Sequence, residues 1–84
     1  MLNKEPEKSK YLNLIVVDDD GDKVYFRKMK FTTPLSKVMH AFCQRQGLRM
    51  GDAVFLYAGE VIKGTQTPDE LGIVDGDEIE VQLV

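Results

Sequence analysis

One segment of this chain has the pattern of an amphipathic α-helix. Residues 33–47 read TPLSKVMHAFCQRQG, and four apolar residues recur there at helical spacing: Leu35, Val38, Met39 and Phe42. We predict that Thr33 is the N-cap, that Pro34 occupies the first helical position and that Gly47 ends the helix. Because one apolar stripe must be buried against another element, this helix needs a sheet to cover it.

The segments around this helix have the alternating pattern of β-strands. YLNLIVV and KVYFRKMKF form a hairpin across the turn signal DDDGD, and DAVFLY, a short return strand in AGEVI and DEIEVQLV follow the helix. TPDELGI predicts a second, short helix, with Thr67 as cap, Pro68 first and Glu70 completing a capping box. The order β-β-α-β-β-short helix-β predicts an α+β roll, in which a mixed sheet wraps over one main helix.

The second arm of the hairpin breaks the strict alternation of a strand. Val24 and Phe26 share one face, whereas Met29 and Phe31 fall on the other. One extra residue near Arg27, accommodated as a β-bulge, would return all four to a single apolar face. The sequence therefore predicts a bulge in this strand.

Length and composition limit the classes of protein that this chain can represent. Eighty-four residues make one small domain, in which a deep substrate cavity has little room. The polar segment MLNKEPEKSK, residues 1–10, predicts a flexible N-terminal arm before a domain over residues 11–84. A single cysteine cannot form an internal disulfide, and the chain has no signal peptide and no membrane-length apolar run. These features favour a reducing intracellular compartment.

The basic residues are concentrated in the middle of the sequence. Seven Lys or Arg and no Asp or Glu lie between Lys23 and Arg49, and all 14 acidic residues lie outside that window. A basic face on a protein of net charge −3 argues against direct nucleic-acid binding and favours local contact with an acidic partner. The alternative is a solvated face on which the charges are segregated by chance.

Cys43 and His40 are the residues that could suggest catalysis. They lie three positions apart on the predicted helix, where side chains can be neighbours. No phosphate-binding loop or ligand cluster accompanies them, and one Cys with one His cannot furnish a zinc site. We interpret Cys43 as a packing residue, and we predict that the chain is not an enzyme and has no cofactor and no metal site.

Several stretches together resemble one protein family. They are YLNLIVV, VYFR, TTPLSKVMHAFCQRQGLRM, FLYAGEVI and TPDELGIVDGDEIEV. The combination of CQRQG, a hydrophobic residue, a spacer and Met with TPxELG and IEV is specific among ubiquitin-like folds. The chain is identified by this resemblance as a member of the small ubiquitin-like modifier (SUMO) family. The match runs from Tyr11 to Val81, in register apart from the extra residue at the expected bulge, and it implies the ubiquitin-like β-grasp roll.

The resemblance also implies a peptide-binding groove between the second strand and the main helix. In the family, a short hydrophobic peptide, the SUMO-interacting motif, adds there as an extra strand. The counterparts here are an apolar floor and a basic rim: Phe26, Met29 and Val38, then Lys28, Lys30, Lys37 and Arg45. All four basic residues lie in the acid-free window. The alternative is that the apolar residues are only core and the lysines only protect an edge strand from aggregation.

Conjugation is the second function that the resemblance implies. Members are attached to lysines of target proteins by an isopeptide bond through a C-terminal diglycine, whereas this sequence ends in EVQLV. Either a tail has been trimmed, or the chain is a non-conjugated SUMO-like domain of a larger protein that acts as a binding scaffold.

The expected partners follow from the same resemblance. They are proteins with SUMO-interacting motifs, the SUMO activating and conjugating enzymes, ligases and SUMO proteases. The protein is expected to be a monomer, without membrane or nucleic-acid contact, in the nucleus and also the cytoplasm. Val54, Ala58 and Val61 occupy positions that often carry charge in relatives, which puts the back-side contact with the conjugating enzyme in doubt.

Overall fold

The computed structural model describes residues 10–84 of the chain. The expected N-terminal arm, apart from Lys10, lies outside the described residues. The elements follow the predicted order: β1 (Tyr11–Val17), β2 (Lys23–Lys30), α1 (Ser36–Gln46), the 3-10 helix η1 (Met50–Asp52), β3 (Ala53–Tyr57), β4 (Glu60–Val61), α2 (Pro68–Leu71) and β5 (Glu78–Leu83). No helix among them is long and apolar enough to cross a membrane.

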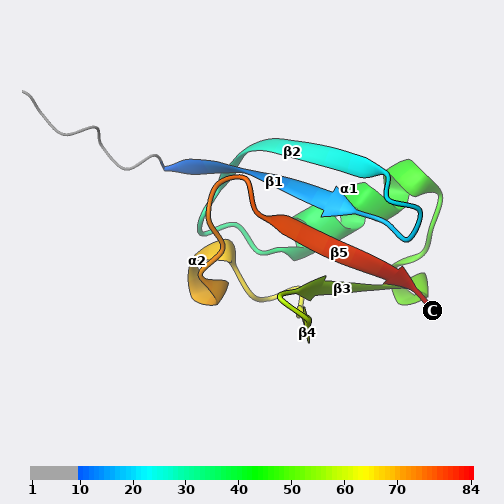
Figure 1. The fold of residues 1–84 in the computed structure, drawn as a ribbon. Helices are drawn as coiled ribbons and strands as arrows, with labels where there is room; N and C mark the ends of the chain where they lie inside the picture. The colour runs from blue at the N-terminus through cyan, green and yellow to red at the C-terminus, as the bar shows by residue number, and fades with distance from the viewer. Residues whose placement is uncertain (1–9) are drawn as a thin grey trace, which may run out of the picture.

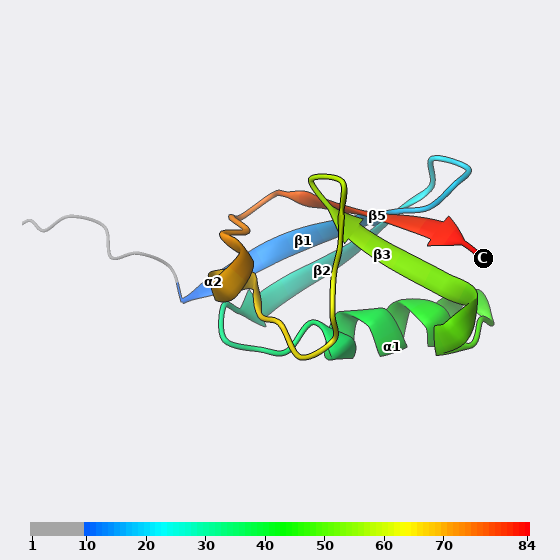
Figure 2. The ribbon, with the colours of Figure 1, turned by 90° about the horizontal axis from the view of Figure 1, so that it is seen from below.

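The five strands form one mixed sheet with α1 packed across one face. Their order is β2-β1-β5-β3-β4, in which β1 and β5 run parallel and the other neighbours are antiparallel. Figure 1 shows the strands in front of α1, and Figure 2 shows the helix lying below the sheet. The predicted α+β roll is therefore correct. β2 and β4 form the two edges of the sheet.

The hydrophobic core lies between this sheet and α1. The inward side chains of β1 and the stripe predicted for the helix are buried together: Leu12, Leu14, Val16, Leu35, Val38, Met39 and Phe42. The ring of Phe42 meets that of Phe55 edge to face, with 5.8 Å between centroids. Burial of a side chain of this size stabilises the fold by about 1.5–3 kcal/mol, so these residues dominate the packing.

The predicted bulge is present in β2. Leu14 pairs with Phe26 and Leu12 pairs with Met29, so that two residues of β2 oppose the single residue Asn13. The register shift keeps Met29 on the face that already holds Val24, and both are buried. An unbulged strand of this sequence would turn Met29 toward solvent, because side chains alternate between faces.

Side chains from two other segments fix the bulge. Lys28 has a φ of 60°, in the left-handed region that is unfavourable for a residue with a Cβ. Its backbone N–H donates to Asn13 Oδ1 at 3.1 Å, and the Asn13 N–H donates to Asp75 Oδ1 at 2.7 Å. The three residues thus link β2, β1 and the loop before β5 at the bulge.

The predicted start of α1 is wrong. The helix begins at Ser36, and Leu35 occupies the N-cap position without a side-chain cap. The Leu35 N–H donates to the Gln66 carbonyl at 2.8 Å, and the Ser36 N–H donates to the Gly64 carbonyl at 3.0 Å. A loop distant in sequence therefore satisfies the donors that a cap at Thr33 was expected to satisfy.

The other predicted helix signals are confirmed. Gly47 ends α1 with a φ of 73°, and its N–H donates to helix carbonyls. At α2 the Thr67 hydroxyl accepts from the Glu70 N–H at 3.2 Å, and Glu70 Oε1 accepts from the Thr67 N–H at 3.0 Å. Pro68 follows the cap, as expected. These signals are local, which explains why the sequence shows them.

We predict that Gly64→Ala destabilises the fold by about 1–3 kcal/mol through overpacking. A Cβ at Gly64 would lie 3.0 Å from the Cβ of Ser36 and 3.6 Å from its Cα, where the loop crosses the start of α1. Gly51→Ala is the matched control, because a Cβ there has no neighbour within 4 Å. Urea unfolding measures both variants. Equal stability of the two would show that the close approach is unimportant.

We predict that Ala58→Asn stabilises the β3–β4 hairpin. Ala58 and Gly59 connect the strands with φ values of 53° and 84°, a geometry that favours Asn followed by Gly. Relief of the left-handed strain at Ala58 should raise the free energy of unfolding by about 1 kcal/mol. Gly59→Ala should have the opposite effect and lower the free energy of unfolding, because it places a Cβ on a residue with a φ of 84°. Thermal unfolding of both variants provides the measurement, and an unchanged midpoint for Ala58→Asn contradicts the prediction.

Candidate functional site

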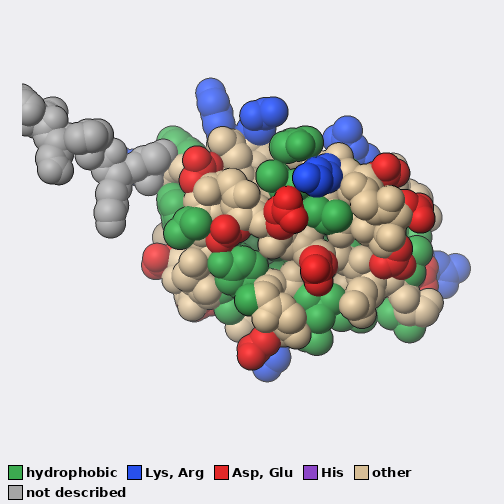
Figure 3. Space-filling model, in the orientation of Figure 1, with side chains coloured by type: hydrophobic (Ala, Val, Ile, Leu, Met, Phe, Trp, Pro, Cys, Tyr) green, Lys and Arg blue, Asp and Glu red, His purple; other side chains and the backbone are tan. Residues whose placement is uncertain are grey.

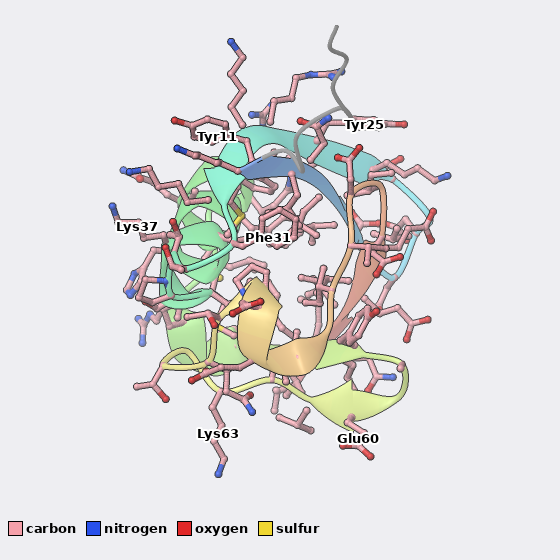
Figure 4. The ribbon with its side chains drawn as sticks, turned by 90° about the vertical axis from the view of Figure 1, so that its left-hand side faces the viewer. Tyr11, Tyr25, Phe31, Lys37, Glu60 and Lys63 are labelled. Atoms are coloured by element: carbon pink, nitrogen blue, oxygen red, sulfur yellow. The ribbon has the colours of Figure 1, made fainter. Side chains whose placement is uncertain are left out.

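A cavity of about 470 Å³ lies between β2 and the start of α1. Six of the seven residues expected from the resemblance line it: Phe26, Lys28, Met29, Lys30, Lys37 and Val38. Four come from β2 at or near the bulge, and two come from the first turn of α1. Figure 4 shows Lys37 pointing outward from α1 on the same side of the molecule as Tyr11, which also lines the cavity.

The floor of this cavity is part of the hydrophobic core. Met29 and Val38 are only 9% and 4% exposed, so a ligand would touch their outermost atoms. Phe26 is partly exposed and packs against the buried cluster. The alternative that the floor residues are only core therefore fits Met29 and Val38. Phe26 offers most of the accessible apolar surface among the three.

The rim of the cavity is basic. Lys28, Lys30 and Lys37 are exposed, and the one salt bridge found among residues 10–84 joins Lys23 to Glu78 at 3.5 Å. In Figure 3 most Lys and Arg side chains lie along the upper edge, where β2 runs in Figure 1, while Asp and Glu are scattered below. Like charges grouped in this way favour an acidic ligand.

Arg45 is the expected rim residue that does not line the cavity. It is exposed in the last turn of α1, eight residues beyond Lys37 and therefore about 12 Å farther along the helix axis. The cavity instead includes Tyr11, Arg27 and Thr33. Arg27 could have been expected from the acid-free window. Tyr11 could not, because only the pairing of Tyr11 with Lys30 places it there.

β2 offers a free main-chain edge beside this cavity. It is the first strand in the sheet order and pairs only with β1 among the described strands. An edge strand presents N–H and C=O groups that can pair with another extended segment. The structure therefore places together an open strand edge, a shallow apolar floor and a basic rim, which suits an extended peptide with acidic residues.

The opposite edge of the sheet has a different surface. Val61 on β4 is 64% exposed, and Ala58 lies in the turn that precedes it. On the same side the Tyr57 hydroxyl donates to Asp77 Oδ2 at 2.7 Å, and this bond raises the pKa of Tyr57 above its usual value. Ala58 and Val61 are apolar where the family resemblance led us to expect charge, whereas the neighbouring Glu60 of β4 is an exposed acid. This edge lies across the sheet from the basic cavity.

Cys43 and His40 do not form a catalytic pair. Cys43 is 2% exposed within the core, whereas His40 is exposed to solvent. Burial raises the pKa of the Cys43 thiol, and the negative charge of Asp52 raises it further. A thiol of raised pKa is a poor nucleophile at neutral pH. The packing role expected from the sequence agrees with this environment.

The chain matches a known protein family along most of its sequence. Residues 12–83 match the family model described as ubiquitin-2 like Rad60 SUMO-like. This chain belongs to that SUMO-like family. It is 42% identical over 81 residues to Small ubiquitin-related modifier 2 of Arabidopsis thaliana, covering 96% of this chain and 78% of the relative. The predicted family is therefore confirmed.

Two further matches extend the comparison. The chain is 47% identical over 75 residues to the ubiquitin-like protein pmt3/smt3 of Schizosaccharomyces pombe, covering 89% of this chain but only 63% of that protein. The solved structure titled Caldiarchaeum Subterraneum Ubiquitin superposes with a TM-score of 0.80 at 20% identity, over 88% of this chain and 94% of that one. The second match shows that the fold is ubiquitin-like.

We predict that iodoacetamide alkylates native Cys43 slowly at pH 7.5. Reaction requires opening of the core, so the rate should be about 100-fold or more below that of the urea-unfolded chain. Mass spectrometry of timed samples measures it. A native rate equal to the unfolded rate would contradict the buried environment.

The raised pKa of the Cys43 thiol determines how the free energy of unfolding should change with pH. The unfolded thiol ionises near its ordinary pKa of about 8.5, below the folded pKa. The stability that comes from keeping Cys43 as a neutral buried thiol is therefore complete below about pH 8.5. It is lost as the pH rises toward the pKa of the folded protein. In the variant Cys43→Ala, the free energy of unfolding should fall less as the pH rises above about 8.5.

Proposed function

We propose that this SUMO-like domain is a protein modifier that is read through the cavity between β2 and α1. The observation that supports this most directly is that the basic rim, the apolar floor and the free edge of β2 coincide at one place. Residue Lys28 belongs to both the edge and the rim. A peptide with a SUMO-interacting motif would add as a strand to β2, with apolar side chains against Phe26 and carboxylates against the lysines.

In the proposed mechanism, the edge of β2 and the apolar floor orient the peptide, and the rim lysines attract it. Main-chain hydrogen bonds to β2 would fix an extended peptide, and its apolar side chains would cover Phe26 and the outer atoms of Val38. The rim lysines would attract acidic or phosphorylated residues beside the apolar core of the motif, because phosphate adds negative charge and acceptor oxygens. Surface charge pairs are individually weak, so the lysines contribute mainly through their number and through the rate of association.

We further propose that the domain is joined to lysines of target proteins through a diglycine that follows Val84. Support comes from relatives that are named small ubiquitin-related modifiers. The partners would then include the activating and conjugating enzymes, ligases and proteases of the SUMO pathway. The full-length coding sequence tests this, together with a thioester assay of the complete protein with a SUMO activating enzyme and ATP. A complete chain without a diglycine would overturn conjugation while leaving peptide binding intact.

A non-conjugated domain that acts as a scaffold is the second candidate. The exposed Val61 and the neighbouring Ala58 favour it, because the resemblance led us to expect charges at the surface that meets the conjugating enzyme. Titration of the domain with a conjugating enzyme separates the candidates. Amide shifts around β4 would support a modifier, and their absence would support the scaffold.

We predict micromolar binding of a peptide that has a Val- or Ile-rich core and an acidic flank, about −7 to −8 kcal/mol. Amide shifts in an NMR titration should map to β2 and α1. The double reversal Lys28→Glu with Lys30→Glu should weaken binding about tenfold, since two attractive contacts become repulsive. Added salt should weaken the charged contribution more than the apolar one.

Lys63→Glu is the control for this prediction. Lys63 is exposed in the loop after β4, and Figure 4 shows it at the end of the molecule opposite to Tyr11. Its reversal changes the net charge in the same direction without touching the cavity. The affinity should therefore change less than twofold, because distant charges screened by salt contribute only about 0.3 kcal/mol. Amide shifts that map outside residues 24–45 would refute the groove assignment.

A further inference from the structure

The chain contains two Asp-Gly pairs, and each of them is followed by Asp. Residues 20–22 lie in the loop between β1 and β2, and residues 75–77 lie in the loop before β5. Both glycines have a left-handed backbone, with φ values of 86° and 88°. The two Asp-Gly-Asp sequences share their residues and the conformation of the glycine, so a difference in reactivity between them must come from the rest of the fold.

An Asp-Gly pair can rearrange without an enzyme. The glycine nitrogen attacks Cγ of the protonated aspartic acid; an N–Cγ bond forms, the Cγ–OH bond breaks, and the hydroxyl leaves with the N–H proton as water. The product is a five-membered succinimide. Addition of one water to either of its carbonyls returns aspartate or gives isoaspartate, in which the main chain runs through the side-chain carboxyl. Glycine favours the attack because no Cβ shields its nitrogen. The nitrogen and Cγ must approach to about 3–3.5 Å, so both groups must be free to move.

Asn13 holds both reacting groups of the second pair. Asp75 Oδ1 accepts the Asn13 N–H at 2.7 Å, and the Gly76 N–H donates to the Asn13 carbonyl at 2.8 Å. The next residue is fixed as well, because Asp77 Oδ2 accepts the Tyr57 hydroxyl at 2.7 Å. These bonds connect the loop to β1 and β3, the two neighbours of β5 in the sheet. The groups of the second pair become free only when the loop separates from the sheet.

The first pair is held only by its own loop. The Gly21 N–H donates to the Asp18 carbonyl at 3.0 Å, and the N–H groups of Asp20 and Asp22 donate to Asp18 Oδ1 at 2.9 Å each. No hydrogen bond or ion pair within the described part of the chain fixes the Asp20 carboxylate. Figure 2 shows this loop projecting from the molecule on the side away from α1. Opening of the loop alone frees both reacting groups, and such local openings require less free energy than separation of a loop from the sheet.

The charges around the first pair also favour the reaction. Carboxylate oxygens of Asp18, Asp20 and Asp22 lie within 4.8 Å of one another, so their negative charges repel. The succinimide is uncharged, and its formation at Asp20 removes one of these three charges. Asp75 belongs to no cluster of three such groups among residues 10–84. Its charged form is instead stabilised by the hydrogen bond from Asn13.

We propose that Asp20 is a site of spontaneous isoaspartate formation in the folded protein, and that the fold protects the Asp75-Gly76 pair from the same reaction. Isoaspartate adds one methylene to the main chain of a loop that the Asp18 N–H closes by donating to the Asp22 carbonyl at 3.0 Å. The added atom disrupts this closure and loosens the β1–β2 turn. This reactivity is independent of peptide binding and of conjugation.

The natural chain supplies its own control for the test. One sample is kept folded in mildly acidic buffer over several weeks, and a second is kept unfolded in urea. Proteolysis followed by mass spectrometry with fragmentation measures isoaspartate at both positions. In urea the two pairs should react at rates within about twofold, because only weak residual structure remains. In the folded chain, position 20 should react at least about tenfold faster than position 75, the effect of one hydrogen bond to a charged group. Equal rates in the folded chain, or no isoaspartate at position 20, would overturn the proposal.

Two variants assign the product to Asp20. Asp20→Glu keeps the charge but would need a six-membered ring, so isoaspartate in the loop should disappear. Asp22→Glu is the matched control, because it also keeps the charge and leaves the Asp20-Gly21 pair intact; its rate should stay within about twofold of the natural one, since a surface change of this kind has little effect on the fold. An equal loss in both variants would contradict the assignment to Asp20.

Amide hydrogen exchange of the purified isoaspartate form tests the structural consequence. The Asp22 amide should lose protection, because its bond to Asp18 Oδ1 depends on the closed turn. The Gly76 amide should keep its protection, since its bond to the Asn13 carbonyl lies in another loop. Unchanged protection at Asp22 would show that the modification does not loosen the turn.

Discussion

Burial of the apolar stripe of α1 against one face of the sheet is the constraint on which the rest of the structure depends. Each strand that passes over the helix must keep its apolar residues on the inner face, and β2 contains one residue too many to do so in regular alternation. The bulge at Lys28 resolves this conflict, and Asn13 and Asp75 hold it in place. A feature of the edge strand is thus a consequence of packing in the core.

The candidate site shares its residues with that core. Met29 and Val38 close the hydrophobic interior from one side and form the floor of the cavity on the other. A floor that is rigid because it is packed costs little conformational entropy when a ligand covers it. The basic residues stand around this floor on two elements, β2 and α1, so the site exists only when the helix is docked.

The two edges of the sheet differ in what they offer to partners. β2 is long, basic and bulged, whereas β4 has two residues, of which Val61 is largely exposed. A bulge and inward or flanking charges are common ways to protect an edge from indiscriminate strand pairing. In this domain the same devices lie beside the cavity that we propose binds a short acidic peptide, so protection against aggregation is compatible with the proposed binding.

The sequence by itself determined the element order, the helix stripe, the bulge near Arg27, the caps at Thr67 and Gly47 and the family. Each of these depends on side-chain alternation, on local backbone preference or on a motif of neighbouring residues. Only the tertiary structure decided that α1 starts at Ser36, because the carbonyls of Gly64 and Gln66 replace the cap expected at Thr33. It also decided that Tyr11 joins the cavity and Arg45 does not. Such placements depend on strand pairing and helix docking between residues distant in the chain, and no local pattern encodes them.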